Sequence, residues 1–87
     1  MGLSHGEFLR SLPAAVVGME FRVQGPRIQV LDAERRVEID LGPEQQRRLG
    51  ALVLPQTPVR LSFHGFSVEK RGEFCKRFDL AFQRGGG

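Results

Sequence analysis

Apolar and polar residues alternate along three runs between Val17 and Leu41, and this pattern constrains the fold more than any other feature of the chain. The apolar members are Val17, Met19, Phe21 and Val23, then Ile28 and Val30, then Val37, Ile39 and Leu41. A period of two places every second side chain on the same face, which is typical of strands buried on one side. The pattern therefore predicts three strands within residues 16–24, 27–31 and 36–41.

The two connections between these strands predict which residues face each other. A two-residue turn at Gly25-Pro26, with glycine at the positive φ of a type II′ turn, sets the first pairing. A four-residue loop over residues 32–35 sets the second. The pairs that follow are Val23 with Ile28, Phe21 with Val30, Val30 with Val37, Ile28 with Ile39, and Arg27 with Asp40. Because a slip of one residue would scatter the apolar side chains over both faces, we expect a three-stranded antiparallel meander in this register.

A helix is predicted over residues 43–54, directly after the meander. Pro43 suits the first position of a helix, and Pro55 marks the point by which the helix has ended. The segment carries a short apolar stripe formed by Leu49, Leu52 and Val53. Gly50 weakens this prediction, because glycine inside a helix costs about 1 kcal/mol relative to alanine.

Alternation returns in residues 58–66 and predicts a fourth strand, with Val59, Leu61 and Phe63 on its apolar side. The sequence leaves open whether this strand pairs with the first or the third. Near the N-terminus, Ser4 is expected to cap a short helix that stops near Pro13. The apolar residues of that helix are Phe8, Leu9 and Leu12.

Residues 67–84 fit two different structures. As a helix capped by Ser67, the segment places five side chains within an arc of about 120°: Phe74, Cys75, Phe78, Ala81 and Phe82. As a hairpin that turns at Arg71-Gly72, it would place Lys76 on the apolar face, so we favour the helix. The three glycines at 85–87 are then a flexible tail at the helix end, since an RGG-type nucleic-acid arm needs many repeats.

The expected fold class is α+β, with a mainly antiparallel four-stranded sheet and helices packed on one of its faces. The order of elements is α-β-β-β-α-β-α, and the strand count rises to five if the tail is a hairpin. Residues 1–84 are predicted to form a single domain. A chain of 87 residues, 40% of them hydrophobic, is near the small end of what can bury a self-sufficient core.

Composition narrows the class of protein further. Cys75 is the only cysteine, which excludes an internal disulfide, and no stretch approaches the roughly 18 apolar residues that cross a bilayer. The N-terminus lacks the basic and apolar regions of a secretion signal. We therefore expect a cytoplasmic protein that is not bound to a membrane and that needs no cofactor. The net charge of +3 is weak evidence for nucleic-acid binding.

The catalytic ingredients of the chain do not form a recognisable arrangement. Ser62, His64 and Asp40 could supply a triad, but alternate residues of one strand lie about 7 Å apart, beyond hydrogen-bond reach. Two distant histidines without suitably spaced carboxylates are a poor metal site. Cys75 is expected to be a small core residue rather than a reactive thiol. We expect no catalytic or metal site, and the enzymatic alternative would depend on His64.

The polar face of the predicted sheet is the remaining candidate site. Its expected binding residues are Arg22, Arg27, Arg36, Arg60 and His64. Neighbouring carboxylates such as Asp40 can neutralise part of this charge, and no aromatic residue is expected there for bases to stack on. We therefore expect a small binding or accessory protein that contacts a protein partner or associates with itself as a homodimer. The alternative is an RNA- or DNA-binding module that uses the same arginines.

Overall fold

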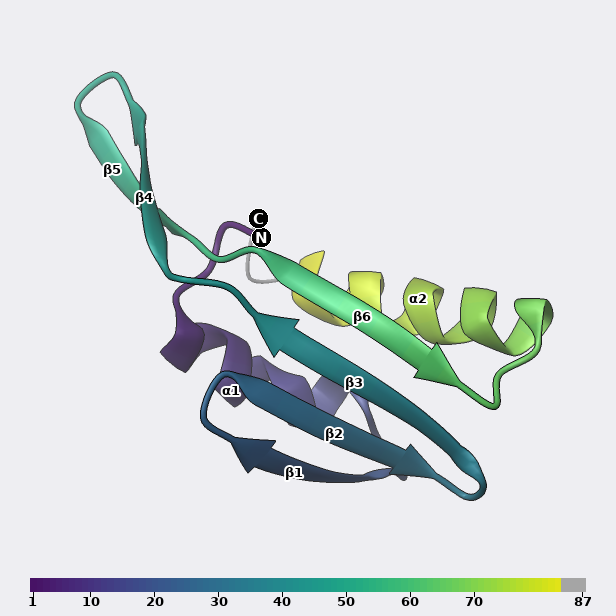
Figure 1. The fold of residues 1–87 in the computed structure, drawn as a ribbon. Helices are drawn as coiled ribbons and strands as arrows, with labels where there is room; N and C mark the ends of the chain where they lie inside the picture. The colour runs from purple at the N-terminus through teal and green to yellow at the C-terminus, as the bar shows by residue number, and fades with distance from the viewer. Residues whose placement is uncertain (84–87) are drawn as a thin grey trace.

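The computed structural model describes residues 1–83 and has an α+β fold, within which two helices and six strands are assigned (Figure 1). In chain order these are α1 (His5–Ala15), β1 (Glu20–Gln24), β2 (Arg27–Asp32), β3 (Arg35–Leu41), β4 (Gln45–Leu49), β5 (Leu52–Gln56), β6 (Val59–His64) and α2 (Val68–Gln83). All pairings are antiparallel. The predicted fold class is confirmed, but the order of the elements differs, because two strands replace the predicted middle helix.

The main sheet has the strand order β1-β2-β3-β6. Every predicted pair of the meander is present, including Phe21 with Val30 and Arg27 with Asp40. Gly25 has the positive φ of 60° that its turn was expected to need. The second connection is shorter than the predicted four-residue loop, because Asp32 pairs with Arg35 and leaves a two-residue turn. β6 pairs with β3, which answers the question that the sequence left open.

Both helices pack on the same face of this sheet, behind the strands in the view of Figure 1. The sheet contributes alternate residues of β2 and β3 to the core, namely Ile28, Val30, Val37, Ile39 and Leu41. The helices contribute Phe8, Leu12 and Ala15 from α1 and Phe74, Phe78 and Phe82 from α2. Period two on the strands and a helical period on the helices therefore meet in one apolar layer.

Six of the seven phenylalanines form a connected aromatic cluster in and beside this layer. Phe8 of α1 stacks on Phe82 of α2 with ring centroids 4.7 Å apart, and this contact ties the two ends of the chain together. Phe21 was expected in the same layer, yet it is 37% exposed. It points toward the helix side of the sheet but lies on the edge strand β1, all five residues of which are exposed.

The helix ends follow the sequence closely. The hydroxyl of Ser4 accepts a hydrogen bond from the backbone N–H of Glu7, while the Glu7 carboxylate accepts one from the Ser4 N–H. α1 ends at Ala15, two residues past the predicted stop, so Pro13 lies in its last turn. α2 confirms the helix reading of the tail and excludes the C-terminal hairpin, with Ser67 bonded to the Lys70 N–H. The predicted glycine tail at 85–87 and the end of the predicted domain at residue 84 lie outside the described residues.

The helix predicted over residues 43–54 is wrong, because this segment is the β4–β5 hairpin. Gly50 has a φ of 60° and, with Ala51, forms the two-residue turn between the strands. An α-helix cannot contain that positive φ. The hairpin forms a separate two-stranded sheet that projects beyond the main sheet, where no core requires an amphipathic helix (Figure 1).

Candidate protein-interaction surfaces

The register of the main sheet places the five predicted binding residues on its open face, opposite the helices. One row across the strands is Gln24, Arg27, Asp40 and Arg60, the next is Arg22, Gln29, Glu38 and Ser62, and the third ends with Arg36 and His64. Sequence reasoning therefore located this face correctly. Its role in binding stays a prediction.

Carboxylates on the same face neutralise much of its positive charge. Arg27 donates a hydrogen bond from Nε to Asp40 Oδ1 at 2.9 Å, and Arg36 Nε lies 3.5 Å from Glu38 Oε1. The hydrogen bond that Arg27 donates to Asp40, together with the negative charges of Asp40 and Glu38, raises the pKa of Arg27. The arginines are thus spaced among negative charges instead of forming one continuous basic patch. Nucleic-acid binding usually requires such a patch.

The residues considered for catalysis lie apart on this face. His64 pairs across the strands with Arg36, two rows away from the Asp40–Arg60 pair. Within residues 1–83, no group of three His, Cys, Asp or Glu side chains could hold a metal ion. Cys75 is partly buried on α2, next in sequence to the core residue Phe74.

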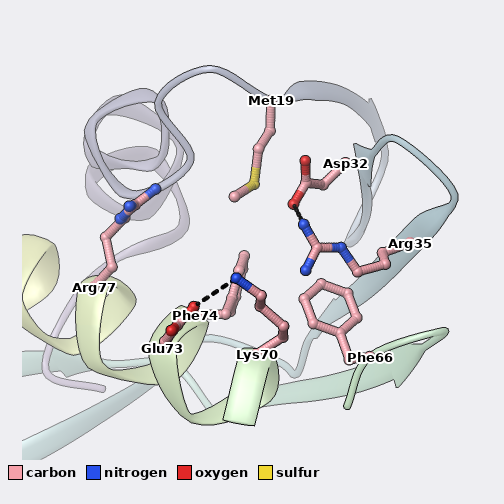
Figure 2. Close-up of a pocket in the computed structure, with 8 residues that line it drawn as sticks. All are labelled: Met19, Asp32, Arg35, Phe66, Lys70, Glu73, Phe74 and Arg77. Carbon is pink, nitrogen blue, oxygen red and sulfur yellow. Dashed lines mark hydrogen bonds and ion pairs between the residues drawn. The ribbon is translucent and has the colours of Figure 1, made fainter.

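A small hollow lies where the β2–β3 turn meets the first half of α2 (Figure 2). Two ion pairs line the hollow: Arg35 with Asp32 at 2.7 Å, and Lys70 with Glu73 at 3.3 Å. Met19 and Phe66 supply apolar surface, and the Arg35 guanidinium lies 5.2 Å from the centre of the Phe66 ring. With about 180 Å³ of space, the hollow is smaller than the roughly 300 Å³ at which pockets for drug-sized ligands begin.

The β4–β5 hairpin is a second candidate surface, which sequence reasoning missed. Its register places Arg47, Leu49, Leu52 and Leu54 on one face, which we call the leucine face. All three leucines are exposed, and Leu52 at the tip is 63% exposed. Beside this face lies a hollow of about 270 Å³ lined by Met1, Gly2, Arg47, Leu49, Leu54, Pro55 and Gln56. The signal that could have located the hairpin is Gly50, because a glycine in the middle of a segment can take the positive φ of a two-residue turn.

The base of the hairpin is held by contacts from several parts of the chain. Gly42 N–H donates to the Pro58 carbonyl at 2.8 Å, which closes the ladder between β3 and β6. The start of α1 adds two contacts, from His5 Nε2 to the Gly42 carbonyl and from the His5 N–H to Glu44. Between β5 and β6, the hydroxyl of the buried Thr57 donates a hydrogen bond to the Leu3 carbonyl at 2.7 Å, and the backbone of Thr57 is hydrogen-bonded to that of Met1.

No protein-family model, curated protein or solved structure matches this chain. Neither α1 nor α2, the helices assigned within residues 1–83, is long and apolar enough to cross a membrane.

Proposed function

We propose that this protein is a non-enzymatic binding protein that contacts another protein through the leucine face of the β4–β5 hairpin. The observation that carries the proposal is the position of the hairpin outside the core with its leucines exposed. Contiguous exposed apolar surface on a small protein usually marks an interaction site. A firmly held hairpin base with an apolar tip is a structure suited to reaching a partner.

The stability of the hairpin supports the same proposal. A two-stranded hairpin with no further packing is marginally stable in water, and none of the buried core residues comes from β4 or β5. A partner that covers Leu49, Leu52 and Leu54 would remove their apolar surface from water, which is worth roughly 25 cal/mol for each Å². Binding would therefore stabilise the hairpin as well as join the two proteins.

The chemistry of the leucine face indicates what the partner surface must offer. Arg47 lies beside Leu54, and Arg48 is on the opposite face beside Val53, while β4 and β5 contain no acidic residue. The complementary surface is therefore an apolar groove with carboxylates at its rim. The hairpin edges could also add a strand to a partner sheet through main-chain hydrogen bonds, because each strand has only one neighbour.

The test compares Leu52→Lys with Leu80→Lys in capture of partners from a native cell extract. Leu80 on α2 is 57% exposed, which is similar to the 63% exposure of Leu52. It is therefore a matched control for replacing an exposed leucine with lysine. We expect the wild type and Leu80→Lys to retain the same protein, and Leu52→Lys to lose most of it. Purified partner and variants then give dissociation constants, for which we expect an increase of at least about tenfold for Leu52→Lys, since a buried charge replaces an apolar contact.

The capture is run in parallel on untreated extract and on extract treated with nuclease, so that retention bridged by nucleic acid is identified. Equal retention by all three proteins would contradict the role of the hairpin. Retention that depends on intact nucleic acid and falls steeply with salt would instead support the alternative function of the arginine-bearing sheet face.

A further inference from the structure

We propose that β1 is the contact between two copies of this chain, which join their main sheets edge to edge into one antiparallel sheet. The sequence raised self-association as an expectation, and the structure supplies a strand for it. This inference goes beyond the proposed function, because it concerns a different strand and names the partner as a second copy.

The hydrogen-bonding groups of β1 are available along its outer edge. β1 has β2 as its only neighbour in the sheet, and all five of its residues are exposed. The two-residue turn is closed by the pair Gln24–Arg27, and such a closing pair exchanges hydrogen bonds. Because antiparallel pairs alternate, Arg22 and Glu20 also bond toward β2, whereas the N–H and C=O groups of Phe21 and Val23 point outward.

The side chains of β1 leave apolar surface at the same edge. Phe21 is 37% exposed and Val23 is 44% exposed, although both lie on the helix side of the sheet, beside the buried Val30 and Ile28. Phe21 is also the one phenylalanine that takes no part in the aromatic cluster. A second sheet placed edge to edge would continue the apolar layer across the contact and cover both residues.

Charge complementarity selects one register for this contact. If Phe21 faces Phe21 of the second copy, Glu20 lies opposite Arg22 of that copy, and the same pair repeats by symmetry. Met19 then faces Val23. Each apolar residue therefore faces an apolar residue, and each charged residue faces one of opposite charge. The neighbouring register that keeps the same hydrogen-bonding phase would place Arg22 directly opposite Arg22, which is unfavourable.

Charge reversal within this pair tests the contact and its register together. Sedimentation equilibrium of the full chain is measured over a concentration series for Glu20→Arg, Arg22→Glu and the double variant. Each single variant places like charges opposite each other twice, so we expect its dissociation constant to rise by about tenfold. The double variant restores both opposite-charge pairs, and we expect its dissociation constant to return to that of the wild type. Glu69→Arg on α2 is the control and should change nothing.

Two results would overturn the inference. One is a wild-type chain that stays monomeric at the highest concentration reached. The other is a dimer whose dissociation constant is the same in all β1 variants. If Leu52→Lys alone abolishes that dimer, the hairpin joins the copies and the β1 contact is wrong. Loss of partner capture by Leu52→Lys while the β1 dimer persists would leave this inference and the proposed function both standing.

Discussion

At the scale of single residues, similar side chains have different roles because of where the strands and helices place them. From composition alone, all seven phenylalanines are equal candidates for the core. In the structure, six of them form the aromatic cluster, whereas Phe21 lies on the edge strand of the sheet. The face to which Phe21 points was predictable from its alternation with Arg22. Its exposure was not, since that depends on how far the two helices extend across the sheet.

This difference predicts unequal costs for the same substitution. Phe8 is fully buried against Phe78 and Phe82, so Phe8→Ala should lower the free energy of unfolding by about 3–5 kcal/mol. Phe21→Ala should cost only about 1 kcal/mol at low protein concentration. Urea denaturation measures both. If Phe8→Ala fails to fold, Phe8→Leu gives a smaller loss that can be measured. Equal losses at the two positions would contradict the described core.

At the scale of elements, prediction succeeded for the sheet and helices of the layered body and failed for the hairpin that projects from it. The meander was predicted down to its register, because the buried residues of β2 and β3 alternate strictly and the short turn at Gly25-Pro26 sets the pairing of β1. The apolar stripe of α2 likewise predicted a helix. Residues 43–54 have no buried partner, so their apolar residues obey neither period strictly, and the turn at Gly50 was mistaken for a weak point of a helix.

Glycine substitutions should separate a turn from a helix by the sign of their effect. Gly72 lies inside α2, and an added Cβ would meet nothing within 4 Å, so Gly72→Ala should raise the free energy of unfolding by roughly 0.5–1 kcal/mol. Gly25 has a φ of 60° in the β1–β2 turn, where alanine is strained, so Gly25→Ala should lower it by about 1–2 kcal/mol. Thermal unfolding of the two variants measures these shifts. A gain at both positions would contradict the assigned turn.

At the scale of the whole molecule, the chain consists of a layered body and a projecting hairpin, with principal extents of 46 × 24 × 19 Å (Figure 1). The body was predictable as one sheet covered by helices. The candidate site was predictable only in part: the open sheet face was located correctly, whereas the hairpin surface depends on a segment that was assigned to the wrong element.

Removal of the hairpin should leave the body folded. Gly42 and Pro58 are already hydrogen-bonded neighbours, so an Asn-Gly turn in place of residues 44–56 can close the β3–β6 pair. Since the excised residues add nothing to the buried core, we expect one cooperative unfolding transition and a free energy of unfolding lower by roughly 1 kcal/mol. Circular dichroism during thermal unfolding measures this. Loss of the cooperative transition would show that the hairpin is part of the folding unit.

The many contacts at the base of the hairpin have a consequence for its direction. A loosely tethered arm would lose orientational freedom each time it docked, and this loss would weaken the complex. Here Pro58 lies against Gly42, with 3.0 Å from its ring to the position of an added Cβ, and His5 and Thr57 hold the two strands from either side. The base of the hairpin therefore fixes its direction in advance, so docking loses less orientational freedom than it would for a loosely tethered segment.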